Sequence, residues 1–404
     1  MSRSRKRSKG TKTSKGAATG TGEEARAIET LIRQLEDAQA TAEAQQQWGG
    51  ALEEHLERCL NRGRTRPLHE ALGRLAAQWR WGALEELRAW IERLSSQEPI
   101  TLAGADGEPM PGEAELFLVP LVIRRTEVLS AENSPLVLPE ASMQTLTESF
   151  RRCGVVEEDE SIMLASLLLP PETLYGLEWL QVRRLNQALL ALLGDEESEA
   201  SLDDLLGAEA PAGPEQGVRL AIGLRFGPTP LAGGFFGGVA DENELEAAER
   251  AWARAFAEPL DTWLGVEEPV REGTLALVPQ PFYSALEEGL SQAADLSVIH
   301  QLMAYLEREH RGAACSLQVD LSGDETALVL RAFGAQGDEP LAEVRRTLYP
   351  HEDALERADG LEATLPASDE AEPGEEEEEA ELPALLRGSG CCSGGNPQGS
   401  PRYH

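Results

Sequence analysis

Lysine is almost absent from this sequence of 404 residues. All four lysines lie in the first fifteen residues, and every positively charged side chain after them is an arginine (Lys6, Lys9, Lys12 and Lys15). The rest of the chain therefore has no side-chain amine. This excludes a P-loop lysine, a protein-kinase β3 lysine, a pyridoxal Schiff base and a lysine-activated serine nucleophile.

Long hydrophobic runs are also missing. The best candidate, Ile162–Leu169, ends at two prolines and falls short of the roughly 18 consecutive apolar residues that cross a bilayer. The first twenty residues carry seven positive charges, no acid and no apolar stretch of signal-peptide length. We therefore expect a soluble cytoplasmic protein that makes no membrane contact.

The five cysteines are too few and too scattered to predict a disulfide framework. Cys59, Cys153 and Cys315 fall within periodic apolar patterns, where a cysteine is usually a small core residue. Cys391 and Cys392 are adjacent, and whether they have a redox or metal role stays open, because one tetrahedral ion would need further ligands. The sequence predicts no metal and no cofactor.

Negative charge is in large excess and is unevenly placed. The chain has 71 Asp and Glu against 36 Lys and Arg, a formal net charge of -35. Residues 1–22 are basic and residues 351–404 are acidic and then Gly-rich, and both predict disordered tails because they have little apolar surface to bury. Nucleic acid is expected to bind only through the basic tail, and contact between the two tails is the alternative.

Apolar periodicity divides the chain between the tails into two kinds of structure. Residues 23–97 carry four amphipathic helical patterns, typical of a small helical bundle. Residues 113–193 follow the order strand, helix, strand, helix; residues 217–350 repeat this order after an acidic linker at 194–216, and they end in a β-hairpin. The sequence predicts an α+β fold with a duplicated β-α-β-α body.

The predicted elements of this body can be stated as ranges. In the first half they are a strand at 116–123, a helix at 140–152, a strand at 161–169 and a helix at 172–193. In the second half they are a strand at 218–226, a helix at 242–263, a strand at 274–278, a helix at 282–310 and hairpin strands at 315–321 and 327–332.

A Gly-rich loop follows the first strand of the second half, and its backbone N–H groups would suit an anion. Its candidate residues are Gly227, Gly233, Gly234, Gly237 and Gly238. Arg124 and Arg225 end the equivalent strands of the two halves and are the candidate side chains for an anionic ligand bound between them. The alternative is that both arginines are solvated or paired with acids, and that the loop packs its phenylalanines on a neighbour.

Three tryptophans lie close together in the second half of the predicted bundle: Trp79, Trp81 and Trp90. Tryptophan at such positions is typical of core or interface anchors, so these are the candidate partner contacts. The chain has no Gly-x-Ser-x-Gly elbow and no His-Glu-x-x-His pair. The sequence therefore favours a non-enzymatic binding or regulatory protein that contacts a partner protein, and the alternative is an enzyme or binder of a small anionic ligand between the two halves. It does not define the oligomeric state.

Three segments carry a family resemblance: Glu115–Arg125 (ELFLVPLVIRR), Leu168–Leu174 (LLPPETL) and Leu277–Leu286 (LVPQPFYSAL). They resemble a beta-proteobacterial family designated domain of unknown function 2863, in element order over residues 25 to 350. The resemblance implies a bacterial cytoplasmic protein. It implies no activity, catalytic residue or cofactor.

Overall fold

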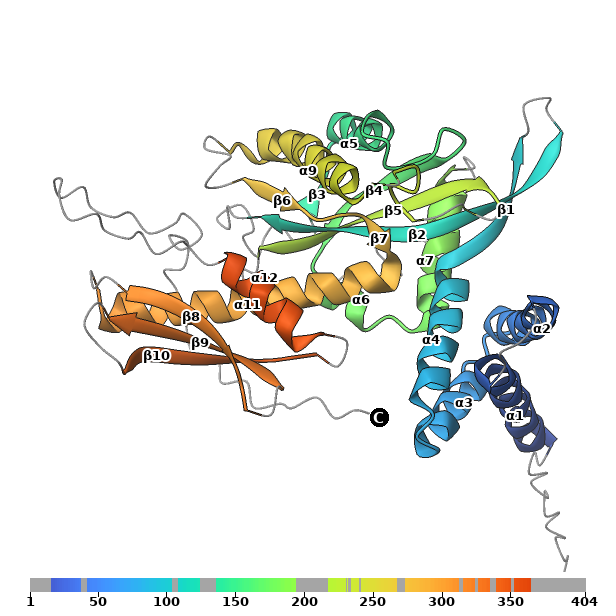
Figure 1. Ribbon diagram of the computed structural model, residues 1–404. Helices are drawn as coiled ribbons and strands as arrows, with labels where there is room; N and C mark the ends of the chain where they lie inside the picture. Colours follow the sequence, from blue (N-terminus) through green and yellow to red (C-terminus); the bar gives the residue numbers. More distant parts are fainter. Residues whose placement is uncertain are drawn as a thin grey trace, which may run out of the picture. The chain divides into compact units, whose positions relative to one another are not determined.

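The structure is a computed structural model, and its contacts divide the chain into two compact units. Unit 1 contains residues 1–101, 113–115 and 177–205, and unit 2 contains residues 102–112, 116–176 and 206–404. The residues that the structure describes are 16–37, 42–103, 108–123, 136–193, 217–229, 231, 234–239, 241–266, 273–311, 315–323, 326–334, 339–349 and 352–364. The predicted α+β class is confirmed, since helices stand beside antiparallel sheets (Figure 1).

Unit 1 is the predicted helical bundle. Its helices are α1 (Gly16–Asp37), α2 (Ala42–Asn61), α3 (Arg66–Ala77), α4 (Trp81–Ser96) and α7 (Trp179–Leu193). Their apolar faces meet in a core of Ile, Leu and Ala side chains, in which Ile28, Leu56 and Leu87 are fully buried. Helix α1 begins at Gly16, inside the predicted basic tail, so that prediction was wrong for residues 16–22. Residues 1–15 lie outside the described residues.

The predicted helix at 172–193 is broken in two. Helix α6 (Pro171–Tyr175) belongs to unit 2, and α7 begins at Trp179 in unit 1. Helix α7 packs on α4, where the Asn186 Nδ2 donates a hydrogen bond to the Ser96 carbonyl oxygen at 2.6 Å. A buried amide therefore satisfies one of the carbonyl groups left without a partner at the C-terminal end of α4.

One antiparallel sheet collects strands from both predicted halves. Its order is β1 (Gln97–Ala103), β2 (Pro109–Ile123), β5 (Val218–Pro228), β4 (Ser161–Leu169) and β3 (Leu136–Val137). Strands β6 (Thr274–Ala276) and β7 (Gln280–Pro281) also pair with β2. Because β5 lies between β2 and β4, residues on both sides of the predicted 194–216 linker build a single sheet instead of two separate layers.

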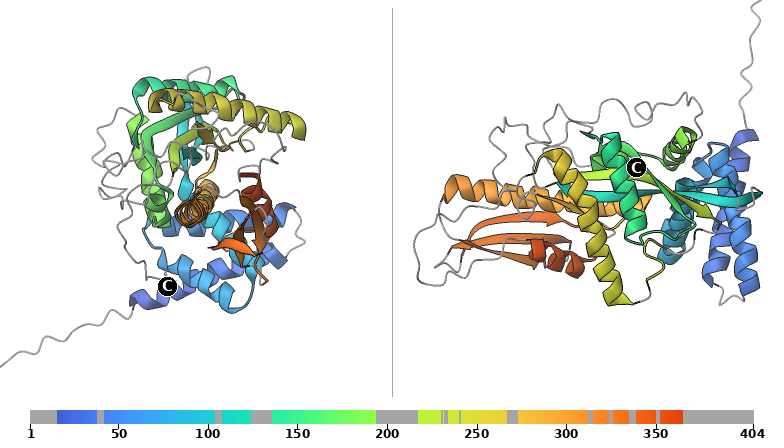
Figure 2. Two further views of the ribbon diagram at one scale, coloured as in Figure 1. Left: turned by 90° about the vertical axis from the view of Figure 1, so that its left-hand side faces the viewer. Right: turned by 90° about the horizontal axis from the view of Figure 1, so that it is seen from above.

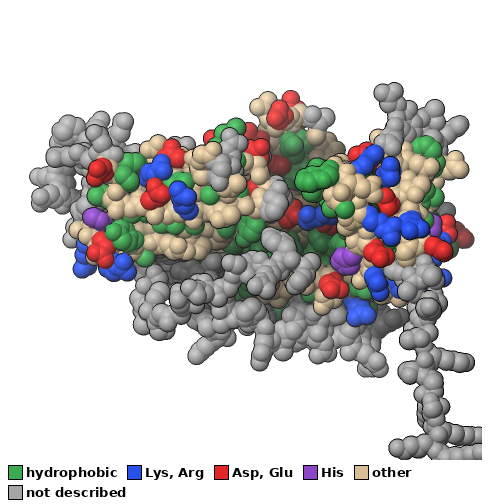
Figure 3. Space-filling view, turned by 90° about the horizontal axis from the view of Figure 1, so that it is seen from below, with side chains coloured by type: hydrophobic (Ala, Val, Ile, Leu, Met, Phe, Trp, Pro, Cys, Tyr) green, Lys and Arg blue, Asp and Glu red, His purple; other side chains and the backbone are tan. Residues whose placement is uncertain are grey.

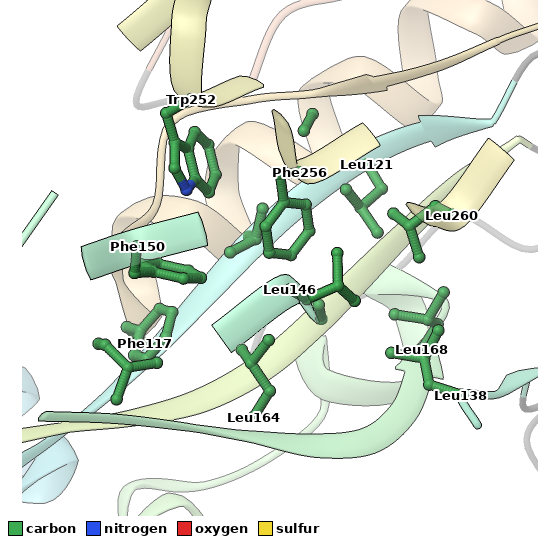
Figure 4. Close-up of a cluster of buried hydrophobic side chains, with 14 of the residues drawn as sticks. Phe117, Leu121, Leu138, Leu146, Phe150, Leu164, Leu168, Trp252, Phe256 and Leu260 are labelled. Carbon is green, nitrogen blue, oxygen red and sulfur yellow. The ribbon is translucent and has the colours of Figure 1, made fainter. Parts of the chain in front are cut away.

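Helices cover both faces of this sheet (Figures 1 and 2). Helices α5 (Glu140–Arg152) and α9 (Glu242–Leu264) lie on one face, and α11 (Phe282–Glu309) lies on the other with α6. Figure 4 shows Phe150 of α5 and Phe256 of α9 pointing at apolar side chains of the strands. Cover on both faces explains why β5 is buried along almost its whole length.

A second, three-stranded antiparallel sheet follows α11. It consists of β8 (Cys315–Leu321), β9 (Ala327–Gly334) and β10 (Pro340–Thr347), in the order β10-β9-β8. The predicted hairpin is confirmed as β8 and β9, and β10 was missed. Helix α12 (Ala354–Thr364) packs on this sheet with Leu361 buried, so the predicted tail was wrong for residues 354–364. Residues 365–404, with Cys391 and Cys392, lie outside the described residues.

Candidate functional site

Two large apolar side chains are exposed side by side at the turn between α3 and α4. Trp79 is 77% exposed and Trp81 is 52% exposed. Their rings meet edge to face, with centroids 5.9 Å apart. We call Trp79, Arg80 and Trp81 the tryptophan corner. Exposed tryptophans that touch each other instead of packing inside are typical of protein-binding surfaces.

The backbone of the corner is fixed by the C-terminal end of α3. The Trp79 N–H donates to the Ala76 carbonyl at 3.0 Å, and the Arg80 N–H donates to the Leu75 carbonyl at 3.1 Å. These two bonds form a Schellman motif, which needs one residue in the left-handed conformation. Trp79 is that residue, with a φ of 57°.

Other described helices end in the same motif with glycine at this position. The left-handed residue is Gly63 (φ 64°) after α2, Gly154 (φ 66°) after α5 and Gly265 (φ 66°) after α9. Glycine is the usual choice because a Cβ atom in the left-handed conformation costs about 1–2 kcal/mol. The chain therefore carries this backbone cost at Trp79 although it uses glycine at equivalent helix ends.

Phe236 is the other described non-glycine residue with a positive φ, at 63°. Its side chain is 2% exposed and packs against Trp252, with ring centroids 6.4 Å apart. Burial of the Phe236 ring in the core offsets its backbone strain. Trp79 has no such compensation, because three quarters of its surface faces solvent. Strain that packing does not offset is typical of functional sites.

Carboxylates surround the tryptophan corner. The Arg80 Nε donates to Glu36 Oε2 at 2.9 Å, so this arginine is already paired. Burial and the neighbouring Glu36 raise the pKa of Glu86. Glu85 is exposed one helical turn after Trp81, on the same side of α4. Glu36, Glu85 and Glu86 outnumber Arg80, so the surface around the corner carries a net negative charge.

Trp90 is separate from the corner. It lies nine residues beyond Trp81, about 13 Å along α4. Its ring is half-buried, lies 3.6 Å from the position a Cβ of Gly49 would take, and has the Arg93 guanidinium 4.5 Å from its centroid. The structure therefore brings Trp79 and Trp81 together and uses Trp90 in the packing of α4 against α2.

A cationic turn, which sequence reasoning did not single out, joins α2 to α3. Arg62, Arg64 and Arg66 are exposed, and none forms an ion pair within the part of the chain that the structure describes. Next to them, His69 stacks on Trp179 with ring centroids 4.8 Å apart. Figure 3 shows positively charged side chains gathered over the helices at its right-hand side. The alternating arginines at 62, 64 and 66 are the signal that would have found this turn.

Arg225, predicted as a ligand for an anion, is engaged by the protein itself. Its Nε donates to Glu160 Oε2 at 2.9 Å and its second terminal nitrogen to Glu160 Oε1 at 2.5 Å. Both side chains are 2% exposed, and the Phe235 ring centroid lies 5.1 Å from the guanidinium. This is the alternative that the sequence left open, pairing with an acid. An added anion would compete with a buried, bidentate carboxylate.

The rest of the predicted anion site is not assembled in the described residues. Arg124 and Gly233 lie outside them. Gly227 faces Glu160, whose Cγ lies 3.0 Å from the position a Cβ would take. Gly234, Gly237 and Gly238 lie in the turn that holds the two phenylalanines of the loop. Phe235 packs on Phe117 at 5.2 Å, so the described part of the loop closes the core.

A buried charge network holds α11, β10 and the start of α12 together. Arg346 Nε lies 2.5 Å from Asp295 Oδ1 and also pairs with Glu352, and Arg357 pairs with Asp295. Burial raises the pKa of Asp295. Burial also opposes ionisation of Glu352, but hydrogen bonds from Arg346, Ser291 and the Tyr349 backbone lower its pKa overall. Asp295, Arg346, Glu352 and Arg357 each form an ion pair within the network, which therefore has the character of a structural clamp.

The described cysteines show no activation. Cys59, Cys153 and Cys315 are free thiols. Burial and the neighbouring Glu24 raise the pKa of Cys59 to about 12, and burial also raises the pKa of Cys315. A raised pKa disfavours the thiolate, which is the nucleophilic form.

Among the described residues, no group of three or more His, Cys, Asp or Glu side chains is arranged to hold a metal ion. None of their helices combines the length and apolarity that a membrane span requires.

Comparisons with protein-family models, curated proteins and solved structures found no match to this chain. The resemblance to the domain of unknown function 2863 family therefore stays a prediction.

Proposed function

We propose that this protein binds a partner protein through the tryptophan corner and acts as a binding or regulatory protein instead of an enzyme. The observation that carries the proposal is Trp79, a bulky residue held at a φ of 57° while 77% exposed. The left-handed backbone and the exposed ring of Trp79 both raise the free energy of the unbound protein. Burial of the two rings by a partner would recover the apolar contribution, at about 25 cal/mol per Å² of apolar surface.

The partner segment would carry an apolar side chain beside a positive charge. The exposed tryptophan rings offer faces that attract both apolar groups and cations. Glu36, Glu85 and Glu86 favour Lys or Arg on the partner by charge complementarity. The same carboxylates would repel phosphates, so base stacking of a nucleic acid on these tryptophans is disfavoured.

The test uses Trp79→Gly, because this substitution keeps the helix-ending motif. An array of short synthetic peptides, in which basic and apolar content vary independently, would be probed with the wild-type chain, Trp79→Gly and Trp81→Ala. We expect peptides that are both basic and apolar to bind the wild type, and each variant to lose about tenfold or more in affinity. Tyr175→Ala removes another exposed aromatic, 60% exposed in unit 2, and should leave binding unchanged.

Two results would overturn this proposal. One is equal binding of the selected peptides to the wild type and to both tryptophan variants. The other is a preference for acidic peptides. Sedimentation of the wild type and Trp79→Gly adds a third measurement: a dimer that becomes a monomer in the variant would show that the corner joins two copies of the chain instead.

The alternative, an anionic ligand between the two predicted halves, has less support. Arg225 is the described member of its arginine pair, and the two carboxylate oxygens of Glu160 already bind its Nε and one of its terminal nitrogens.

A further inference from the structure

The cationic turn carries positive charge that the rest of the described protein does not use. Its arginines, Arg62, Arg64 and Arg66, are exposed, and none forms an ion pair or a side-chain hydrogen bond with a described residue. Carboxylates are abundant, since the chain has 71 Asp and Glu against 36 Lys and Arg. The guanidinium groups of the turn nevertheless keep their N–H donors for an anion from outside.

The backbone on both sides of the turn is fixed. The N–H groups of Gly63 and Arg64 close the last turn of α2, with bonds of 3.0 and 2.8 Å to the carbonyl oxygens of Leu60 and Cys59. No side chain caps the start of α3 at Thr65, so the positive end of that helix dipole also faces the turn. The arginines therefore project from a defined backbone into a positive local potential.

An exposed aromatic ring lies next to these arginines. His69 follows Arg66 by three residues, so the two share one side of α3. The His69 ring stacks on Trp179 of α7, with centroids 4.8 Å apart and an interplanar angle of 25°. The start of α7 also reaches the turn, since Leu180 Cδ1 lies 4.0 Å from the position a Cβ of Gly63 would take. Trp179 covers one face of the His69 ring, and because the residue is exposed, a planar group can stack on the other face.

Carboxylates in this part of unit 1 do not neutralise the turn. Glu24 approaches Cys59, Glu70 follows on α3, and Glu178 precedes α7, but none of the three pairs with an arginine of the turn. Arg184, exposed one helical turn after Leu180, adds a further cation without an ion pair among the described residues. The net charge of -35 still repels any polyanion, so binding should be modest and strongly dependent on salt.

We infer that the cationic turn binds single-stranded nucleic acid, whose phosphates pair with the arginines while a base stacks on His69. Guanidinium groups bind phosphates in a bidentate manner, and every base has a flat face for an aromatic ring. An acidic peptide would satisfy the arginines but leave the ring unused, and a duplex keeps its base faces stacked inside. The tryptophan corner lies at the opposite end of α3, a helix of 12 residues and about 18 Å. This site therefore goes beyond the proposed function.

Three probes test the inference by fluorescence anisotropy with the full chain at low salt. The first is a ten-nucleotide oligothymidine, the second is a strand with the same phosphates but no bases, and the third is a ten-residue polyglutamate. We expect the wild type to bind oligothymidine about fivefold or more tightly than the abasic strand or polyglutamate, since stacking on His69 needs a base.

Two sets of variants separate the phosphate contacts from the stacking contact. The triple variant Arg62→Gln, Arg64→Gln and Arg66→Gln should weaken both strands. It should also reduce the slope of log K against log salt by about 2, because each phosphate contact of a single strand contributes about 0.7. His69→Ala should abolish the preference for oligothymidine over the abasic strand without changing the slope, and His69→Tyr should retain that preference.

A matched control removes the same charge elsewhere. The triple variant Arg250→Gln, Arg254→Gln and Arg308→Gln changes three exposed arginines of unit 2 and should bind both strands like the wild type. Replacing the seven Lys and Arg of residues 1–15 by Gln removes binding through the basic tail. This variant should still bind oligothymidine and still respond to loss of the turn.

Four results would overturn the inference. They are no binding of oligothymidine at low salt, equal affinity and equal salt slope in the two triple arginine variants, survival of the base preference in His69→Ala, and polyglutamate binding as tight as oligothymidine. The last result would identify the turn as a contact for an acidic protein. All substituted side chains are exposed, so a loss of binding can be separated from a failure to fold.

Discussion

Gly63 and Trp79 occupy the same position in two copies of one helix-ending motif. Both are left-handed, at φ 64° and 57°, and in both copies the next residue donates its N–H to the helix. The two residues differ in what they do to stability and to the surface. Glycine takes this conformation without strain, whereas tryptophan adds strain and an exposed ring.

The first prediction concerns this strain. Trp79→Gly and Trp79→Ala remove the same ring, but only glycine also removes the Cβ. We expect Trp79→Gly to be more stable than Trp79→Ala by about 1 kcal/mol, measured by urea unfolding. Gly63→Ala makes the opposite change, because it adds a Cβ to a left-handed residue, and it should destabilise the protein by a similar amount. Equal stability of the two Trp79 variants would show that the left-handed conformation carries no cost there.

The second prediction concerns the centre of the sheet. Gly223 of β5 lies under the Phe117 ring, and a Cβ at this position would come within 2.4 Å of it. Gly223→Ala should therefore destabilise the protein by about 1–3 kcal/mol through overpacking. Gly234 has open space around its Cβ position, so Gly234→Ala should change stability by less. The unfolding midpoints of both variants check this.

The third prediction concerns the buried pair of Arg225 and Glu160. Removing one partner leaves the other charge buried without compensation, which costs about 3–5 kcal/mol. We expect Glu160→Gln and Arg225→Gln each to lower stability by about this amount. The double variant should be more stable than the sum of the two losses predicts, as measured by a double-mutant cycle. Additive losses would contradict a direct pairing.

The fourth prediction concerns acid stability. The pKa of Glu352 is lowered in the folded protein from 4.5, so its contribution is complete above pH 4.5 and is lost as the pH falls through the folded pKa. The pKa of Asp295 is raised from 3.8. Its shift acts in the opposite sense, adding stability at low pH that is lost as the pH rises through the raised pKa.

Glu352→Gln should therefore be less stable than the wild type near neutral pH, and this difference should shrink below pH 4.5. Asp295→Asn removes the opposing contribution, so acid should destabilise this variant more steeply than the wild type. Thermal unfolding midpoints across the acidic range measure both effects. Parallel pH profiles for all three proteins would show that the network does not control acid stability.

Local sequence patterns predicted many element boundaries. The helix at 140–152 and the strands at 161–169 and 315–321 match α5, β4 and β8 at both ends. Their apolar spacing and flanking signals are local, so they can be read without knowledge of the fold. Strand β10 was missed because charged residues interrupt it and its surface is half-exposed, which leaves little alternation to detect.

The candidate site was only partly accessible from the sequence. Tryptophan at positions 79, 81 and 90 suggested anchors, but periodicity could not separate the exposed pair from the half-buried Trp90. The left-handed backbone of Trp79 was not predictable either, because glycine is the residue that signals it.

The sequence by itself determined the α+β class, the helical bundle, the absence of lysine chemistry and the order of most elements, since these depend on composition and local spacing. Only the tertiary structure decided that β5 lies between β2 and β4 and that Arg225 finds Glu160, 65 residues away. It also decided which tryptophans face solvent. These features depend on which distant segments meet in the core, and the free energy of that packing is not encoded in any local pattern.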